Sequence, residues 1–340
     1  VLEMLGDIKK LVGELDEGVK YWNDALLLWK QLDEKESEGR LHRKMARPFY
    51  EMGNIEKAYE CLDKALKILE ALPESVELAT VYNLRAAALW ATGHMTEAFS
   101  WAEKALGLAE KLKDFEGIAE SCFLLGTISG ATGDLKKCIE CLEKALKIAL
   151  DKGYMEMALR AYNNLAVSLP AEESERHLEY LEKGFELAKK AGDISHQSWL
   201  GGNLAEMYMN MGKMNEAVLL AEEAVALDRK SGNVFHLSMS LSLLGGFYIV
   251  LGDWDKAEQY GQEAFSISQK LKHFQSVAYS YWCLGLLAFD KGEYAKAREF
   301  FEKTCEACEK AGAKSHTMWF SRWVIWGHIE LGEFKEAKYV

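Results

Sequence analysis

The stretch "LGGFYIVLGDWDKAEQYGQEA", residues 244–264, holds two apolar helical patterns on either side of a glycine turn. Small residues stand at fixed distances from Gly252: Gly245 precedes it by seven residues, and Ala257 and Ala264 follow it by five and twelve. Two antiparallel helices can approach closely only where neither presents a large side chain. The spacing therefore predicts a helical hairpin.

The same hairpin pattern repeats along the whole chain. Turn glycines recur every 40 residues, with one wider interval of 79 between Gly133 and Gly212. They are Gly13, Gly53, Gly93, Gly133, Gly212, Gly252, Gly292 and Gly332. A second series stands where each second helix would end in a left-handed cap: Gly153, Gly192, Gly232 and Gly312. Asp193 and Asn233 follow this series as expected N-caps, so the chain is predicted to be an all-α solenoid of stacked helix pairs.

Counting hairpins predicts eight full pairs, then a truncated ninth with a first helix around 315–331 and a stub, "EFKEAKYV". We expect a single solenoid over 1–340, and a fragment of a longer protein because a terminal repeat normally carries a polar cap. The fifth unit replaces the glycine turn with Pro170 and Glu172, which indicates either a break between sub-arrays near 168–176 or a turn variant. Pro48 falls inside a predicted first helix, which it should bend.

These positions resemble the tetratricopeptide repeat family. The family's Leu-Gly, aromatic, Gly, Ala and Ala positions are matched by Leu244, Gly245, Tyr248, Gly252, Ala257 and Ala264. The family's proline after the second helix is missing, and the repeat is longer than the common one of about 34 residues. This long variety is similar to arrays in STAND-type signalling ATPases, LuxR-type regulators and kinesin light chains. The resemblance implies a right-handed superhelix whose first helices line a concave groove for a peptide or protein segment.

Composition and charge exclude several classes of function. The net charge of −12 argues against a nucleic-acid footprint, which needs a basic stripe. No apolar run reaches the roughly 18 residues of a membrane span, and the first residues show no signal peptide. Seven cysteines suit a reducing compartment, so we expect a cytoplasmic protein.

Two C-x-x-C pairs, Cys138 with Cys141 and Cys305 with Cys308, are the main candidates for metal chemistry. They lie on different hairpins, and Cys138 takes a slot that holds alanine in other repeats, so packing is the favoured interpretation. Three histidines at one repeat position, His196, His236 and His316, are interpreted as repeat inheritance. No nucleophile motif or phosphate loop appears. We therefore expect no enzyme, cofactor or metal site, with an α/α-toroid enzyme as the weaker alternative.

The resemblance places the binding residues on the first helices. Arg40, Arg43 and Arg47 share one helix face and would form a site for a carboxylate or phosphate; the alternative is pairing with Glu34, Glu36 or Glu38. Toward the C-terminus the groove positions are apolar, either as interface anchors or as core. They are Trp199, Met239, Ile249, Tyr279, Trp282, Phe289, Trp319 and Trp326. Asn83, Asn163 and Asn203 could bond a peptide backbone.

Two functions follow as hypotheses. The first is a scaffold that holds a peptide or protein segment, with an acidic end at the arginines and apolar residues among the tryptophans. The second is the sensor arm of a STAND-type signalling ATPase or transcription regulator, which binds an inducer and relieves autoinhibition.

Overall fold

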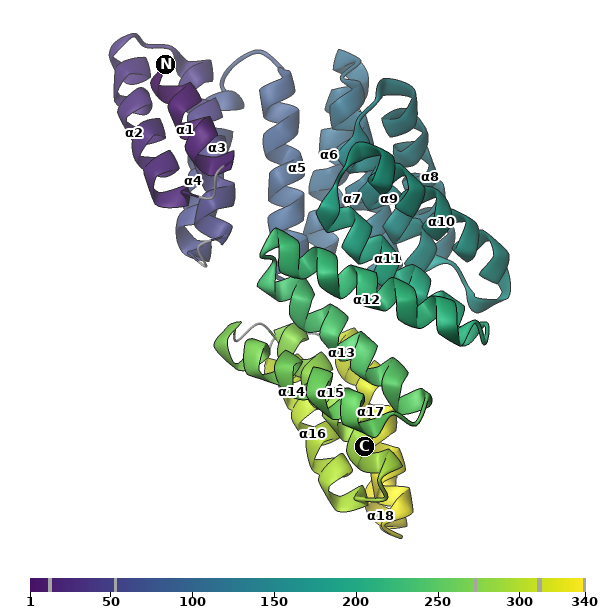
Figure 1. Cartoon of the computed structure of the whole chain (residues 1–340). Coiled ribbons are helices and arrows are strands. Elements are labelled where there is room, and N and C mark those ends of the chain that lie inside the picture. Colours follow the sequence, from purple (N-terminus) through teal and green to yellow (C-terminus); the bar gives the residue numbers. More distant parts are fainter. Residues whose placement is uncertain (12–13, 52–53, 272–273, 311–313, 339–340) are drawn as a thin grey trace. The chain divides into compact units, whose positions relative to one another are not determined.

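The computed structural model describes all residues except 12–13, 52–53, 272–273, 311–313 and 339–340, and the described chain is helical without strands (Figure 1). The first four helix pairs are α1 (Leu2–Leu11) and α2 (Leu15–Gln31), α3 (Lys35–Glu51) and α4 (Ile55–Leu69), α5 (Val76–Ala91) and α6 (Met95–Leu112), and α7 (Phe115–Thr132) and α8 (Leu135–Lys152). The next four are α9 (Met155–Ser168) and α10 (Ser174–Ala191), α11 (Ile194–Asn210) and α12 (Met214–Ser231), α13 (Val234–Val250) and α14 (Trp254–Leu271), and α15 (Phe274–Asp290) and α16 (Tyr294–Lys310). The chain continues with α17 (Lys314–Glu330) and α18 (Phe334–Ala337).

This order confirms the predicted all-α solenoid of stacked pairs. Eight pairs precede α17, which is the predicted ninth first helix, and α18 is the predicted stub. Pro48 lies inside α3, as the sequence indicates. None of the described helices combines the length and the apolar character needed to cross a membrane.

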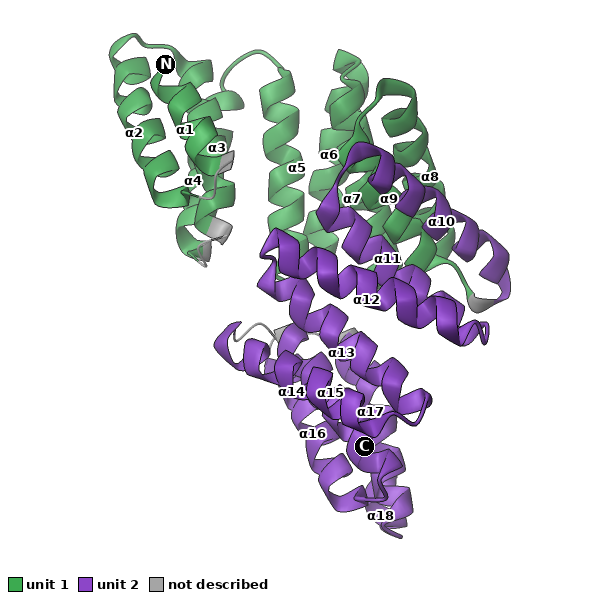
Figure 2. Ribbon diagram, in the orientation of Figure 1, with its two compact units in different colours: residues 1–170 green, residues 171–340 purple. Residues whose placement is uncertain are grey.

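The chain divides into two compact units, Val1–Pro170 and Ala171–Val340 (Figure 2). The boundary falls in the stretch 168–176, where the sequence left a break and a turn variant open. There, α9 ends at Ser168, Leu169 takes an extended conformation, and the short 3-10 helix η1 (Ala171–Glu173) precedes α10. That the two units form a single solenoid stays a prediction.

Glycine turns and caps separate the helices as the spacing predicts. Gly252 has a φ of 75° in the turn of its hairpin, and Gly153 caps α8 with a φ of 74°. This left-handed conformation costs little only for glycine. Asp193 and Asn233 are the expected N-caps. Each side chain accepts a hydrogen bond from the backbone N–H of the residue three positions later, at 3.0 and 3.1 Å. Three of the predicted glycines, Gly13, Gly53 and Gly312, lie outside the described residues.

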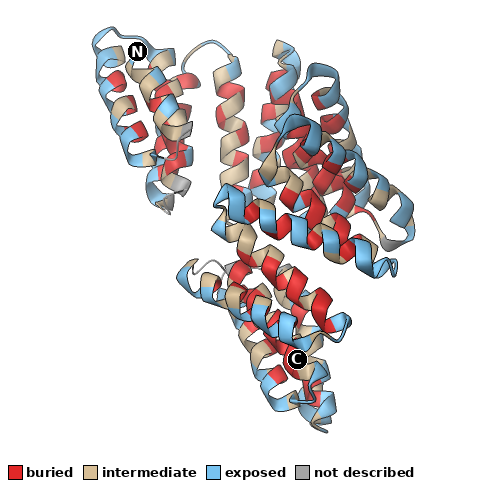
Figure 3. Ribbon diagram, in the orientation of Figure 1, coloured by how far each residue is buried: buried red, intermediate tan, exposed pale blue. Residues whose placement is uncertain are grey.

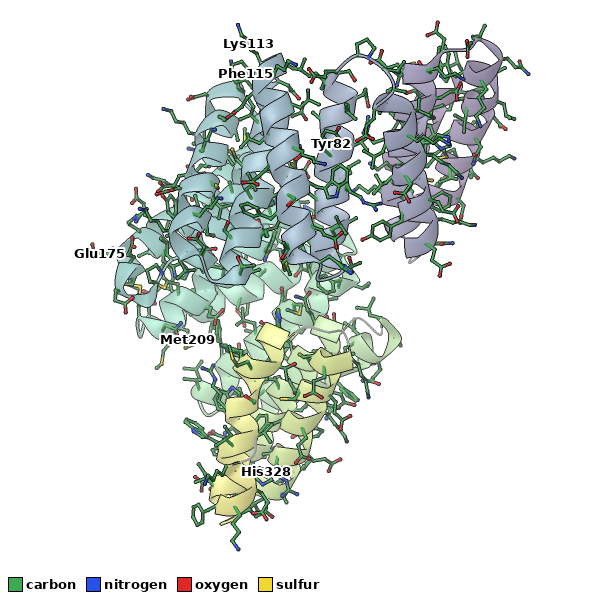
Figure 4. All side chains as sticks on the ribbon, turned by 180° about the vertical axis from the view of Figure 1, so that it is seen from behind. Tyr82, Lys113, Phe115, Glu175, Met209 and His328 are labelled. Carbon is green, nitrogen blue, oxygen red and sulfur yellow. The ribbon has the colours of Figure 1, made fainter. Side chains whose placement is uncertain are left out.

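Two second helices are followed by a left-handed residue other than glycine: Asp33 after α2, with a φ of 55°, and Lys113 after α6. Lys113, between α6 and α7, takes the left-handed conformation with a φ of 56° (Figure 4). Because that conformation costs a residue with a Cβ about 1–2 kcal/mol, Lys113→Gly should raise the free energy of unfolding by about 1 kcal/mol in urea titrations followed by circular dichroism. Lys147→Gly, inside α8, is the control and should lower it by a similar amount. A destabilised Lys113→Gly variant would contradict this account of the cap.

Small residues let the helices within each hairpin pack closely. A Cβ added at Gly126 of α7 would lie 2.7 Å from Leu142 Cγ and 3.0 Å from the Cys138 carbonyl oxygen of α8. Cys138 itself is fully buried, in the slot that holds alanine elsewhere. Figure 3 shows buried residues on the faces that helices turn toward one another.

Ion pairs join neighbouring second helices on the outer side of each unit. In unit 1, Lys144 Nζ of α8 lies 2.9 Å from Glu110 Oε1 of α6. In unit 2, Arg229 of α12 lies 2.8 Å from Glu263 of α14. These side chains remain largely exposed, so each pair adds at most about 1 kcal/mol.

Candidate functional site

The first helices line the inner side of each unit. Successive first helices pack against each other: α3, α5, α7 and α9 in unit 1, and α11, α13 and α15 in unit 2. Among the described residues, successive second helices make no comparably extensive contact. Closer packing of the first helices bends each unit toward them, so the first-helix face is concave.

A basic cavity of about 360 Å³ opens on the first-helix face of unit 1. Four cationic side chains line it against one carboxylate, together with Trp22, Thr80 and Leu84. The charged residues are Lys10, Arg43, Lys44, Arg47 and Asp7. The sequence predicted Arg43 and Arg47; Lys10, Lys44 and Trp22 were missed because they come from other helix faces and from the neighbouring hairpin.

Carboxylates of neighbouring first helices engage two of the predicted arginines. Arg40 donates to both carboxylate oxygens of Glu3, at 2.9 and 3.1 Å, and Arg43 donates to Glu77 at 2.7 Å. The partners considered from the sequence were Glu34, Glu36 and Glu38. The observed partners lie 37 and 34 residues away, close to one repeat, so they come from α1 and α5.

Lys44 completes the network around Glu3. Its ammonium lies 2.9 Å from Glu3 Oε1 and 2.8 Å from Asp7 Oδ2. Burial by itself would raise the pKa of Glu3, but the hydrogen bonds from Arg40 and Lys44 hold it at about 2. Glu3 is therefore ionised at neutral pH and holds the Arg40 guanidinium, which is not among the residues that line the cavity.

Two of the three predicted asparagines, Asn83 and Asn163, are buried. Asn83 is 4% exposed; its amide donates to the Gly117 carbonyl at 3.4 Å and its Oδ1 accepts from Ser121 at 2.9 Å. Asn163 is also buried and donates to Asn164 at 3.4 Å. Both side chains thus serve contacts within unit 1. Asn203 is half-buried on α11.

Unit 2 presents aromatic side chains on its first helices. Trp199 of α11 and Trp319 of α17 are each 41% exposed, and Trp326 is 53% exposed. The other predicted groove residues are half-buried: Met239, Tyr279, Trp282 and Phe289. Ile249 is buried and belongs to the core. The sequence left open whether these residues are core or interface anchors. Ile249 belongs to the core, whereas the three tryptophans are exposed and can contact a partner.

Trp282 is the centre of an aromatic cluster between α15 and α17. Its ring centroid lies 5.9 Å from that of Trp319, 6.1 Å from that of Tyr279 and 6.3 Å from that of Trp323. The guanidinium of Arg322 lies 4.2 Å from the Trp319 ring centroid, a cation–π distance. Trp323 and Arg322 were missed in the sequence, although both stand on the same helix as Trp319.

Two titratable groups on the first helices of unit 2 have shifted pKa values. Glu206 of α11 is solvent-exposed, yet the surrounding protein raises the pKa of its carboxyl. Burial, with smaller effects from the charges of Glu206 and Cys308, raises the pKa of Tyr279 to about 12.

The paired cysteines and the three repeat histidines are buried or half-buried. Cys138 and Cys308 are fully buried, and burial raises the pKa of both thiols, that of Cys308 to about 11. The residues described by the structure contain no group of three His, Cys, Asp or Glu arranged to hold a metal ion. The Trp199 ring lies 6.2 Å from the rings of both His196 and His236. Burial lowers the pKa of His236 and of His316.

Comparison with known families gives matches over more than half of the chain. One tetratricopeptide repeat model matches residues 40–111, 194–270 and 236–310, and a second matches residues 119–152. A search of curated protein sequences gives no match.

Several solved structures share the fold. The apo form of the quorum sensor NprR from B. thuringiensis is 17% identical with a TM-score of 0.66, over 98% of this chain and 97% of NprR. A Rap protein complexed with Competence and Sporulation Factor is 13% identical with a TM-score of 0.64, over 98% of both chains. A STAND protein with a tetratricopeptide repeat sensor from Pyrococcus horikoshii is 15% identical with a TM-score of 0.64, over 94% of this chain and 50% of that protein. At these identities the likeness concerns the fold alone.

Proposed function

Since this chain belongs to the tetratricopeptide repeat family, we propose that it is a scaffold that binds a peptide or protein segment on its first-helix faces. The observation that carries the proposal is the exposure of Trp199, Trp319 and Trp326 on the inner side of unit 2. Exposed tryptophans are costly in water and are typical anchors of protein interfaces.

Each unit offers a different chemistry to the bound segment. The unit 1 cavity, with Lys10, Arg43, Lys44 and Arg47, suits a carboxylate or another acidic group. The aromatic cluster around Trp282 in unit 2 suits apolar side chains. The scaffold we propose is cytoplasmic and acts without catalysis, cofactor or nucleic acid. The bound segment belongs to another protein or to further domains of the same protein.

Removal of the exposed tryptophans tests the proposal. A phage-displayed library of random 12-residue peptides is selected against the chain, and the selected peptides are titrated by calorimetry. Because interface tryptophans often contribute 2 kcal/mol or more, a Trp319→Ala, Trp326→Ala variant should bind apolar peptides about 30-fold or more weakly.

The control is Trp254→Ala on the second helix α14, where the tryptophan is likewise 41% exposed. This variant should bind as the unaltered chain does. Equal affinity of all three proteins would reject the first-helix face of unit 2 as the binding surface.

A second candidate is the sensor arm of a signalling ATPase or transcription regulator. The likeness of fold to a STAND sensor and to the quorum sensor NprR supports it. In this case an inducer binds the array and relieves autoinhibition of the parent protein. The two candidates differ in a simple respect: a free scaffold binds its segment in isolation, whereas a sensor arm changes the nucleotide turnover of a linked domain.

A further inference from the structure

Glu206 is an unpaired carboxylate on the inner face of unit 2. It is solvent-exposed and forms no ion pair or hydrogen bond with any residue that the structure describes. The surrounding protein raises the pKa of its carboxyl.

The next first helix leaves an opening beside Glu206. Gly246 of α13 stands 40 residues later, at the equivalent repeat position, and a Cβ added there would meet no atom within 4 Å. The third helix, α15, presents half-buried Leu286 at the same position. Because α13 packs against both α11 and α15, Gly246 stands between Glu206 and Leu286, and the space that a side chain would take there is open. This open space is called the recess below.

Aromatic residues stand two helical turns before the recess residues on both flanking helices: Trp199 on α11 and Tyr279 on α15. Tyr279 of α15 lies close enough for the charge of Glu206 to act on its phenol. Trp199 stands two helical turns before Glu206 on α11 and keeps 41% of its surface exposed. A cationic side chain gains from a carboxylate at its tip and from aromatic or aliphatic surface along its stem.

We propose that the recess between Glu206, Gly246 and Leu286 binds a lysine or arginine side chain of the segment held by unit 2. This inference rests on the proposed function and specifies the ligand: a positive charge flanked by apolar residues. The charge pairs with Glu206, the stem lies over Gly246, and the flanking residues contact Trp199 and Tyr279. Glycine is required at position 246 because a side chain there would fill the space that the stem needs.

Peptides with a fixed central residue test the charge preference. Arrays of 10-residue peptides carry Arg, Lys, citrulline or Glu at the centre, with Leu, Phe, Met and Ser varied elsewhere. Since a charge-assisted pair is worth roughly 1.5–3 kcal/mol, the chain should bind Arg and Lys peptides at least about tenfold more tightly than citrulline peptides. Glu206→Gln should abolish this preference, while Glu223→Gln, an exposed carboxyl of α12, should keep it.

The second measurement is peptide binding by a variant in which a larger side chain at position 246 fills the recess. Gly246→Leu should weaken binding of every peptide class by tenfold or more while helicity is maintained, because leucine favours a helix more than glycine does. Gly107→Leu is the matched control: this glycine of α6 also has no atom within 4 Å of an added Cβ, and its substitution should leave binding unchanged. Circular dichroism verifies that both variants fold.

The outcomes separate this inference from the proposed function. Peptides that bind equally well with Arg, citrulline or Glu at the centre would overturn the cation site and leave the scaffold standing. A preference that survives Glu206→Gln would overturn it as well. If no peptide bound at all, the scaffold and the cation site would both be rejected.

Discussion

Replacing Phe301 by alanine is expected to lower the free energy of unfolding by about 3–5 kcal/mol, the usual cost of removing a large buried aromatic side chain. Phe301 is 1% exposed and joins α16 to α15 and α17. Its ring centroid lies 5.8 Å from that of Trp323, and its neighbours in the core include Ala288 and Val324. Urea unfolding followed by circular dichroism measures the loss.

Phe334→Ala is the control, because that ring is 68% exposed on α18, and the change should cost less than about 0.5 kcal/mol. Gly285 offers a sharper test. A Cβ on Gly285 would lie 2.5 Å from Phe301 Cε1, so Gly285→Ala should be destabilising by itself. In the Phe301→Ala background this clash disappears, and the two changes should be far from additive. Additive losses would show that the ring does not pack over Gly285.

Acidification should weaken unit 1 through Glu3. The pKa of this carboxyl is about 2 in the folded chain against an ordinary value of 4.5, so the unfolded chain takes up the proton first. Stability from this group is present above about pH 5 and is lost as the pH falls toward 2. At 1.36 kcal/mol per pKa unit the loss is about 3 kcal/mol, since the Glu3 side chain is only 17% exposed.

Glu3→Gln should remove this part of the pH dependence and lower stability at neutral pH, because Arg40 and Lys44 would lose their shared carboxylate. Glu34→Gln, at an exposed position before α3, should leave the pH profile unchanged. The measurement is urea unfolding at a series of pH values between 2 and 7, a range that includes the folded and the unfolded pKa of Glu3. Identical pH profiles for the unaltered chain and Glu3→Gln would contradict the assigned network.

The sequence is informative about the fold because the determinants of a hairpin are close together in the chain. Gly252, Ala257 and Ala264 lie within one repeat, and a glycine turn flanked by small residues permits few alternatives. The helix ends could be predicted for the same reason, because their caps are local. Asp193, for example, caps α11 by accepting a hydrogen bond from the backbone of a residue only three positions away. Repetition of the signal removed the ambiguity of any single segment.

Partners across repeats were harder to predict. Arg40 pairs with Glu3 rather than with the nearby carboxylates, because stacking places the preceding first helix, α1, beside α3. Asn83 illustrates a second difficulty: Ser121, 38 residues further along the chain, closes its position by donating to its side chain. The opening at Gly246 depends on which atoms are absent around it, and no residue pattern encodes that.

The ion pairs between second helices have a mechanical consequence. Lys144 with Glu110, and Arg229 with Glu263, bridge adjacent hairpins on the side opposite the first-helix contacts. Charges in such exposed positions are screened over about 10 Å at 0.1 M salt, whereas the close contacts of small residues inside each hairpin are indifferent to salt. We therefore expect salt to weaken the links between adjacent second helices while the packing within each hairpin stays unchanged, so each unit should bend more easily at high ionic strength.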